Sequence, residues 1–331
     1  MSTSKLTLQT DKSASMLQNL DEKFNNFLRI VALPIIGLVI FMLIWNIGAK
    51  QVDTSLGKFP GPVEVMQQSQ NLISEHLEER ARATAFYERQ EERNAKRLAK
   101  DPNAPVKWRE YNGRPTFIDQ IGTSLITVLA GFILATLIAV PLGICIGLSS
   151  SLNSALNPII QIFKPVSPLA WLPLVTMVVS AVYVSDDPMF AKSFITSLIT
   201  VSLCCLWPTL LNTSVGVSSI SSDLQNVSQV LRLNWLTHVR KIVLPSSIPM
   251  IFTGMRLSLG IAWMVLIAAE MLAQNPGLGK FVWDEFQNGS SNSLGRIMVA
   301  VVVIGLIGFC LDRMMLMLQR WLSWDKTSVA R

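Results

Sequence analysis

The chain has 331 residues, of which 50% are hydrophobic and 15% are charged, and its mean hydropathy is +0.41. This composition excludes an ordinary soluble domain and indicates a protein of the lipid bilayer. The formal net charge of +6 does not indicate a nucleic-acid partner, because the basic residues form neither a long run nor a patch interleaved with aromatic residues.

Six apolar stretches qualify, or nearly qualify, as membrane spans, since a helix needs roughly 20 apolar residues to cross about 30 Å of hydrocarbon. We therefore predict an all-α integral membrane fold with six transmembrane helices. The polar residues 1–26 that precede the first span do not have the pattern of a signal peptide. The predicted spans are Phe27–Ile47, Thr123–Leu148, Pro168–Val184, Phe194–Leu211, Ile251–Leu272 and Ile297–Leu318.

A hydrophilic insertion, residues 48–119, follows the first predicted span (residues 27–47). It begins with turn residues, continues with a charged helical segment from Val63 to about Lys100, and ends in a stretch rich in Pro, Asn and Gly. Two interpretations are open for the helical segment: a solvated helical hairpin, or a platform for a partner outside the cell.

The third and fourth spans are short and contain prolines near their ends, where a missing amide donor and a kink are tolerated best. After them, residues 214–245 connect the fourth span to the fifth. Apolar residues at helical spacing from Leu224 to Leu231 predict a short amphipathic helix there. A second helix is predicted from Trp235 to Val243, stopping before Pro245.

These two helices, with a bend between them, are expected to form a compact knob outside the membrane. A knob with an apolar face is suited to dock in a groove on a partner protein. The bare alternative is an ordinary connector between two spans, which would need only a few residues.

Basic residues set the expected orientation. They are enriched before the first span, in the loop of residues 214–245 and after the last span, and the positive-inside rule places such segments in the cytoplasm. Both termini, residues 1–26 and 321–331, are therefore expected to be cytoplasmic tails. The insertion of residues 48–119 is then expected in the periplasm, because the rule applies weakly to loops longer than about 60 residues.

The end of the knob resembles the signature loop of binding-protein-dependent ABC importer permeases. That loop reads Glu-Ala-Ala, three residues, Gly, nine residues, Ile, one residue, Leu-Pro. Ile242, Leu244 and Pro245 match it, whereas Asn226, Val227 and Ser228 replace Glu-Ala-Ala and Arg232 replaces Gly.

Other motifs are similar to the nitrate and bicarbonate permease branch of this family, which is close to the sulfonate and taurine permeases. The resemblance covers Thr116 to Leu322, and its motifs include Lys164–Pro173, Leu206–Thr213, Phe252–Arg256, Ala268–Leu272 and Asn275–Trp283. It implies a type I ABC importer permease fold over residues 120–320. It also implies transport of nitrate or nitrite across the inner membrane, with bicarbonate and then sulfonates or taurine as alternatives.

The same resemblance implies the partners. These are a second permease copy in a homodimer, two ABC ATPase subunits and a substrate-binding protein. No nucleotide-binding motif is present in the chain, so ATP and Mg²⁺ are expected on the ATPases. We expect no catalytic residue, cofactor or metal ligand in this chain. A membrane enzyme is a more distant alternative, because His76 in the insertion and His238 in the loop are the only histidines and cannot form a metal cluster within the bilayer.

Two sets of site residues follow. The predicted contacts with the ATPase are Asn226, Val227, Leu231, Arg232, Leu233, Asn234, Trp235, His238 and Pro245. The candidate residues of the translocation pathway are Ser124, Trp171, Ser202, Trp207, Arg256, Ser258 and Trp263. Among the pathway residues, Trp263 is a candidate gate, because Gly260 and Ala262 are expected to leave open space around it.

Charges within the spans are costly in lipid and need an explanation. Arg256 either holds a loop and snorkels, or attracts an anion into the pathway. Glu270 is interpreted as structural, because a carboxylate facing the pathway would repel an anion. Asp312 and Arg313 are interpreted as an interface pair or as snorkelling charges.

The main rival is a secondary transporter driven by an ion gradient. Such a protein is expected to contain inverted repeats, broken midplane helices and buried carboxylates. No convincing internal repeat is present in the sequence.

Overall fold

The computed structural model describes residue 28 and residues 32–54, 57–101, 105–184 and 189–322. The predicted cytoplasmic tail of residues 1–26 and residues 323–331 of the second tail lie outside this range. The chain divides into two compact units, residues 1–67 and 68–331, and each is considered by itself.

Among the described residues of the first unit, the apolar helix α2 (Leu33–Ala49) stands in place of the predicted span Phe27–Ile47. Its 17 residues correspond to about 26 Å of helix, and nearly all of their side chains are exposed, as suits a helix surrounded by lipid. A short antiparallel hairpin of β1 (Asp53–Thr54) and β2 (Gly57–Lys58) follows. The indole Nε1 of Trp45 donates a hydrogen bond to the carbonyl of Pro60 at 3.2 Å.

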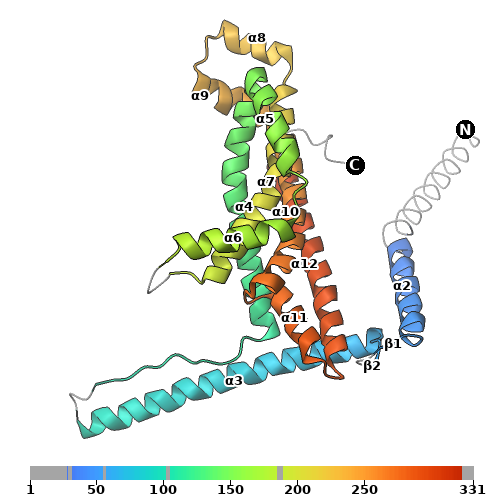
Figure 1. Cartoon of the computed structure of the whole chain (residues 1–331), viewed down its shortest axis with the longest axis vertical. Coiled ribbons are helices and arrows are strands. Elements are labelled where there is room, and N and C mark those ends of the chain that lie inside the picture. Colours follow the sequence, from blue (N-terminus) through green and yellow to red (C-terminus); the bar gives the residue numbers. More distant parts are fainter. Residues whose placement is uncertain (1–27, 29–31, 55–56, 102–104, 185–188, 323–331) are drawn as a thin grey trace, which may run out of the picture. The chain divides into compact units, whose positions relative to one another are not determined.

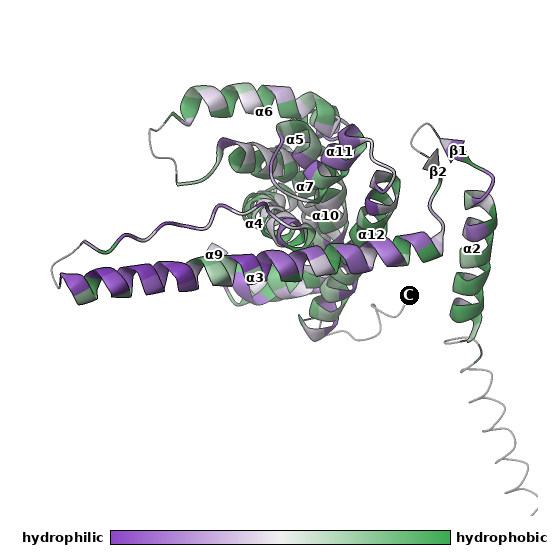
Figure 2. Ribbon diagram, turned by 90° about the horizontal axis from the view of Figure 1, so that it is seen from below, coloured by the Kyte–Doolittle hydropathy of each residue, from purple (hydrophilic) through white to green (hydrophobic). Residues whose placement is uncertain are grey.

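A long helix, α3 (Pro62–Lys100), begins in the first unit and makes up most of the predicted insertion. It is one continuous helix, so the helical hairpin expected there is wrong. The chain returns beside α3 as the extended segment of residues 105–116 (Figures 1 and 2). The helix is continuous because no turn residue interrupts Val63–Lys100. It ends where it does because the Pro- and Gly-containing segment that follows cannot continue a helix.

Hydrogen bonds attach the returning segment to α3. The phenol of Tyr111 donates to Glu79 at 2.8 Å, which raises the pKa of Tyr111, because ionisation would place two negative charges together. Nearer the bundle, His76 Nδ1 lies 2.6 Å from Thr116 Oγ1, and Arg80 pairs with Asp119. Thr116 and Asp119 form a capping box that starts the next helix.

The second unit is a helical bundle that contains the predicted permease core. In the described part of the chain, four helices are long and apolar enough to span a membrane. These helices are α4 (Phe117–Leu148), α7 (Lys192–Ser218), α10 (Leu244–Ala273), which continues the shorter helices of the knob, and α12 (Ser293–Leu322). The predicted spans at these places are all present, and each helix is longer than its apolar stretch.

The third predicted span, Pro168–Val184, is not a straight crossing. Helix α5 (Ser150–Phe163) and helix α6 (Pro168–Val182) together are long and apolar enough for a fifth span, but they are bent by 98° at the break between them. Pro165 and Pro168 lie at that break, where two residues without an amide hydrogen prevent a continuous helix. The fourth span also differs from expectation, because Pro208 lies inside the 27-residue helix α7 rather than near its end.

Helix α7 lies between α4 and α10 and contacts both along its length. Glycines of α4 make the close approach possible: a Cβ on Gly147 would lie 2.6 Å from Val217 Cβ, and one on Gly143 would lie 2.7 Å from Thr213 Cβ. These two glycines are four residues apart, the spacing with which small residues let membrane helices touch. The core of the bundle is therefore built on backbone contact between α4 and α7.

Candidate functional site

The predicted knob is present, and we define it as residues Ser222–Val243. It consists of α8 (Ser222–Val230), α9 (Trp235–His238) and the π-helical turn η2 (Val239–Val243). Figure 1 shows α8 and α9 at the end of the bundle opposite to α11 (Leu278–Asn288). The amphipathic helix predicted from Leu224 to Leu231 is thus confirmed with small shifts of its ends.

The bend between the two helices is made by backbone geometry at Arg232, whose φ of 46° lies in the left-handed region. The amide of Leu233 donates to the carbonyl of Ser228 at 3.1 Å, which closes the turn. Asn234 then caps α9 by accepting a hydrogen bond from the amide of Thr237 at 3.0 Å. The family pattern places Gly at the position of Arg232, and a left-handed φ is the conformation that Gly adopts without strain.

A hydrogen bond inside the knob joins its two helices. Ser228 Oγ lies 2.7 Å from His238 Nδ1, and Ser228 is buried. Because Ser228 is on α8 and His238 is on α9, the bond fixes the angle between the helices. Ser228 stands within the replaced Glu-Ala-Ala segment, so this departure from the family pattern has a structural role in this chain.

The outer face of the knob is apolar and uncovered. Trp235 is 62% exposed and Val230 is 81% exposed. Arg240 and Lys241 line a pocket beside this face together with Leu236 and Thr237. The exposed apolar side chains of the knob are Leu224, Val227, Val230, Leu231, Trp235 and Leu236.

The inner face of the knob is buried against the bundle. Val239 and Val243 of η2 form one apolar cluster with Ile144 of α4 and Val217 of α7. A displacement of the knob therefore acts on both of these helices, because close-packed clusters transmit movement rather than absorb it.

The predicted end of the second knob helix before Pro245 is wrong. Helix α9 passes through η2 directly into α10, which starts at Leu244. Pro245 lies in the first turn of α10, a position where its missing amide hydrogen costs little. The wider π turn precedes it, so α9, η2 and α10 form one uninterrupted helix from Trp235 to Ala273.

The nine predicted ATPase contacts fall in two places. Asn226, Val227, Leu231, Arg232, Asn234 and Trp235 are exposed on the knob, and Leu233 and His238 are half-buried within it. Pro245 lies behind the knob at the start of α10. Their contact with an ATPase stays a prediction.

Ser124, a candidate pathway residue, is fully buried beside Glu270. Its hydroxyl lies 2.8 and 2.9 Å from the two carboxylate oxygens of Glu270 and accepts from the amide of Leu278 at 2.9 Å. Glu270 also accepts from the amide of Gly279 at 3.0 Å. Glu270 thus binds one free amide at the start of α11 directly, and Ser124, its hydrogen-bond partner, binds the other, which agrees with the structural interpretation of Glu270.

Ser258 and Ser202 are buried at contacts between helices. Ser258 Oγ accepts from the amide of Thr209 at 3.1 Å and donates to the carbonyl of Cys205, two groups one turn apart in α7. The serine of α10 therefore bridges α7 directly after Pro208. Ser202 Oγ lies 2.9 Å from the carbonyl of Gly131 in α4.

Arg256 pairs with Asp312 of α12 through two contacts, one of them between Nη2 and Oδ2 at 3.0 Å. The pair lies beside a cavity of about 530 Å³, whose lining also includes Thr253, Gly260 and Gln319. Asp312 therefore forms an ion pair across the interface between α10 and α12 and balances the charge of Arg256. This agrees with the interpretation of Asp312 as an interface residue rather than as a snorkelling charge. Arg313, the next residue in the sequence, does not pair with Asp312 among the described residues; its guanidinium lies over the ring of Phe309 at 4.9 Å.

The open space expected around Trp263 is not there. Its indole is 6% exposed, donates to the carbonyl of Ile304 at 2.9 Å and rests against Gly308. The glycine that makes room for it is on α12, not Gly260 of its own helix. Trp171 and Trp207 both stack on Phe163, at centroid distances of 5.9 and 6.4 Å, next to the bend between α5 and α6. A pathway role for the seven candidates stays a prediction.

One polar cluster was missed by the sequence interpretation. Arg296 at the start of α12 pairs with Glu75 of α3 at 2.6 and 3.0 Å and with Glu285 of α11 at 2.7 Å. Ser293 donates to Glu285 at 3.0 Å. The connection of residues 274–296 therefore contains a helix and a charge cluster that attaches the insertion to the bundle.

Comparison with known proteins assigns the family. Residues 139–324 match the model of the binding-protein-dependent transport system inner membrane component. The chain is 34% identical over 226 residues to the nitrate import permease protein NrtB of Synechococcus elongatus, covering 65% of this chain and 77% of that protein. It is 31% identical over 323 residues to the bicarbonate transport system permease protein CmpB of the same species, covering 97% of this chain and 99% of that protein.

The fold has a solved counterpart. A chain of the MetNI methionine ABC transporter, in an inward-facing conformation, aligns with a TM-score of 0.54 at 12% identity, over 62% of this chain and 95% of that chain. The architecture is accordingly that of type I ABC importer permeases. With the family model covering more than half of the residues, the chain belongs to the inner membrane components of binding-protein-dependent transport systems.

Proposed function

We propose that this chain is the permease subunit of an ATP-driven importer. In this proposal two copies form the path through the membrane, two ABC ATPase subunits dock on the two knobs, and a substrate-binding protein delivers the substrate from outside. The observation that carries it is the knob itself, which leaves an apolar face exposed while its other face packs on α4 and α7. An uncovered apolar face of this kind is typical of a site for a protein partner.

The proposed mechanism follows from the two faces of the knob. ATP and Mg²⁺ bind to the ATPases, whose closure brings the two knobs together. Because Val239 and Val243 are packed against α4 and α7, the helices rock with the knobs between an inward-open and an outward-open arrangement. In this account the knob and both termini are cytoplasmic, and the insertion is periplasmic.

Two knob variants test the coupling. Trp235→Ala removes the largest exposed apolar side chain of the knob, and Arg232→Glu reverses a charge beside it. Each is expected to lower the amount of substrate transported per ATP hydrolysed about tenfold or more, since truncating a central interface residue costs about 2 kcal/mol or more. Reconstituted complexes in liposomes provide both rates.

A matched control is Phe286→Ala on α11. Phe286 is 58% exposed, so the variant removes a large aromatic side chain at the end of the bundle away from the knob. Its transport per ATP should stay near that of the parent. Equal losses in Trp235→Ala and Phe286→Ala would contradict a coupling role for the knob.

For the substrate we propose nitrate or nitrite, with bicarbonate as the second candidate and sulfonates or taurine as the third. Support for nitrate comes from the relatives named as nitrate permeases. Support for bicarbonate comes from the relative that aligns over almost the whole chain, the insertion included. Nitrate and bicarbonate are both flat, singly charged groups of three oxygens, so one pathway suits either.

Uptake by the reconstituted complex distinguishes the substrates. Vesicles that contain ATP are given nitrate, bicarbonate or taurine separately, each with the purified binding protein outside. ATP-dependent accumulation of nitrate alone is the expected result. Accumulation of bicarbonate without nitrate would replace the first candidate by the second and leave the importer proposal intact.

A further inference from the structure

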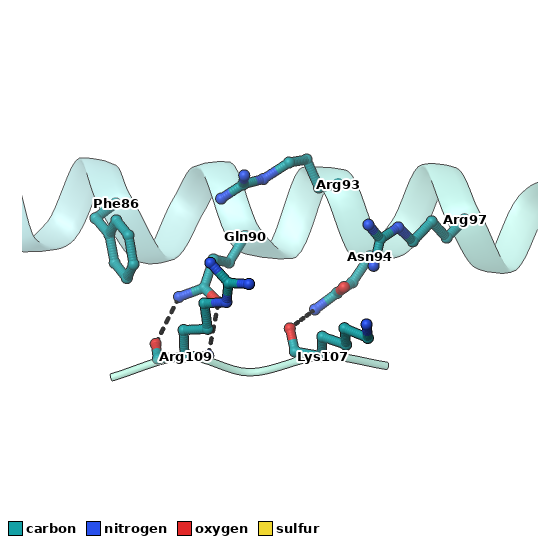
Figure 3. A pocket seen from close by; sticks show the side chains of 7 residues that line it. All are labelled: Phe86, Gln90, Arg93, Asn94, Arg97, Lys107 and Arg109. Atoms are coloured by element: carbon teal, nitrogen blue, oxygen red, sulfur yellow. Dashed lines mark hydrogen bonds between the residues drawn. The ribbon is translucent and has the colours of Figure 1, made fainter. Parts of the chain in front are cut away.

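The cavities that basic side chains line differ in their surroundings. One lies between the end of α3 and the returning segment, where Gln90 and Asn94 point from the helix to that segment (Figure 3). The basic side chains around it are all exposed, so water solvates their charge. Another lies between the spans α10 and α12 and contains the Arg256–Asp312 pair. A charge inside a span needs a stronger reason than a charge at the surface, and it marks a functional site more often.

Arg256 lies deep in its span. Helix α10 runs from Leu244 to Ala273, so Arg256 is about 18 Å from one end of the helix and about 26 Å from the other. In α4, α7 and α10 it is the only basic residue that is not at a helix end. Because a guanidinium at this depth is costly in lipid, its open side is expected to face water or protein.

The guanidinium is on an open face of α10. Leu257, Gly260 and Met264 of this face are exposed, and a Cβ on Gly260 would have no atom within 4 Å. The side chains of Arg256 and Asp312 are 40% and 33% exposed, and the cavity beside them has a volume of about 530 Å³. A small anion can therefore reach the guanidinium.

Asp312 holds this guanidinium in the two-point manner in which arginine binds oxyanions. Nε of Arg256 donates to Oδ1 and Nη2 donates to Oδ2, the second bond at 3.0 Å. Nitrate and bicarbonate are flat and present pairs of oxygens like those of a carboxylate, so either can take the place of Asp312 at the same fork. The exchange keeps both charge-assisted hydrogen bonds to Arg256. Binding is then weak enough for the anion to leave again, as a transport path requires.

The alternative is a pair that only fastens α10 to α12. These helices are also joined on both sides of the pair. Towards one end, the indole of Trp263 donates to the carbonyl of Ile304 at 2.9 Å. Towards the other, Gln319 Nε2 donates to the carbonyl of Pro249 at 3.4 Å. A fastening role does not account for the cavity or for the exposure of the two charged groups.

We propose that Arg256 is an anion-binding residue of the transport path and that Asp312 is its resting counter-ion, which an incoming flat oxyanion displaces. The inference rests on the proposed function, in which the path carries nitrate, nitrite or bicarbonate. It adds the residue that recognises the negative charge and the competitor that keeps the affinity of that residue low. The displaced carboxylate stays hydrated, because a third of Asp312 is already exposed.

Thiol protection tests the proposal without ATP and without partner subunits. The four cysteines of the chain are replaced by Ala, and Gly260→Cys, one turn from Arg256, places a thiol in the cavity. This reference chain, at full length in nanodiscs of uncharged lipid, is treated with an anionic methanethiosulfonate reagent. Nitrate and bicarbonate are expected to slow the reaction saturably. Chloride at matched ionic strength and pH should require a higher concentration, because it has no pair of oxygens for the fork.

Neutralising Asp312 separates a competitor from a fastening contact. Asp312→Asn in the reference chain should lower the nitrate concentration that gives half protection about tenfold, because a fork that is occupied most of the time has a correspondingly reduced apparent affinity. The matched control is Asp284→Asn. Asp284 pairs with Lys280 at 2.7 Å on α11, away from the cavity, so this variant should not change half protection.

Two changes at Arg256 test the binding group itself. Arg256→Lys keeps the charge but loses the fork, and should raise the half-protecting nitrate concentration about tenfold. Arg256→Met with Asp312→Leu replaces the pair by apolar side chains of similar size, an exchange that usually preserves the fold. Protection should disappear in this double variant, while the midpoint of thermal unfolding stays near that of the reference chain.

Four outcomes would overturn the proposal. Absence of protection in the reference chain would show that no anion binds beside Arg256, and protection that persists in the double variant would place the anion elsewhere. Equal protection by chloride would show a general charge effect. Unchanged half protection in Asp312→Asn would show that Asp312 only fastens the helices. Failure of the importer proposal is distinguished from all of these, because it appears as absent ATP-dependent uptake by the complete complex.

Discussion

Arg232 occupies a position where the family pattern has Gly, and its backbone adopts a left-handed conformation that is unfavourable for a residue with a side chain. Its φ of 46° costs an L-residue about 1 kcal/mol or more, whereas Gly adopts the left-handed region without that cost. Arg232→Gly is therefore expected to stabilise the folded chain by about 0.5–1 kcal/mol. The midpoint of thermal unfolding in detergent measures the change.

The control at this position is Arg232→Ala, which removes the same long side chain but keeps the strained conformation. It should leave the midpoint unchanged or slightly lower. If both variants raised the midpoint equally, the gain would come from loss of the charge, and the backbone account would be incorrect.

Gln90 is the residue that attaches the returning segment most firmly to α3, through two hydrogen bonds of 2.8 Å to Arg109. Gln90→Ala removes both and leaves two main-chain groups without partners, which costs about 1–3 kcal/mol locally. Amide exchange at residues 107–111 is expected to become faster by about tenfold or more, because each loss of about 1.4 kcal/mol of local stability raises the population of the open state about tenfold. Mass spectrometry of the exchanged protein reports it. Glu91→Ala, on the neighbouring exposed position, should leave exchange unchanged.

Between elements, the contact of α4 with α7 is the feature most sensitive to side-chain size. A Cβ on Gly147 would lie 2.7 Å from the carbonyl oxygen of Ser214, so the helices must separate to accept Ala. Gly147→Ala is expected to destabilise the bundle by about 1–3 kcal/mol. Gly122→Ala on the same helix has no atom within 4 Å of the new Cβ and should stabilise by about 0.5–1 kcal/mol. Thermal unfolding of the two variants gives the comparison, and a stabilising Gly147→Ala would contradict the packing described here.

The sequence predicted most elements because long apolar runs have few alternatives to membrane helices. The knob was predictable for a related reason, since an apolar pattern at helical spacing in a polar loop has a clear meaning. The bend between α5 and α6 was not, because prolines are tolerated near the start of a span and do not reveal the angle. The continuous passage from α9 to α10 was missed because Pro245 usually ends a helix, and the π turn that accommodates it has no sequence pattern of its own.

Across the whole molecule, the positions of candidate site residues were harder to predict than the fold. Ser124 binds Glu270 across 146 residues of sequence, and Arg256 binds Asp312 across 56. A single sequence contains no signal for such pairs, because each serine or charge is equally compatible with a polar pathway and with a buried contact. The helices of the knob were predictable because their apolar pattern is local, whereas the role of their residues stays a prediction.

For the whole molecule, we propose that the exposed face of the knob receives the force of ATP hydrolysis. The buried face of the knob then passes this force to α4 and α7. The claim predicts that the chain alone has no energy source for accumulation. It also predicts that the ATPases act only through the knob.

The most direct test is substrate accumulation in liposomes that contain the permease with its ATPases and binding protein, with and without ATP inside. Accumulation is expected only with internal ATP, and only when the ATPases are present. Full accumulation by the permease chain alone, driven by a proton or sodium gradient, would contradict the account and identify a secondary transporter.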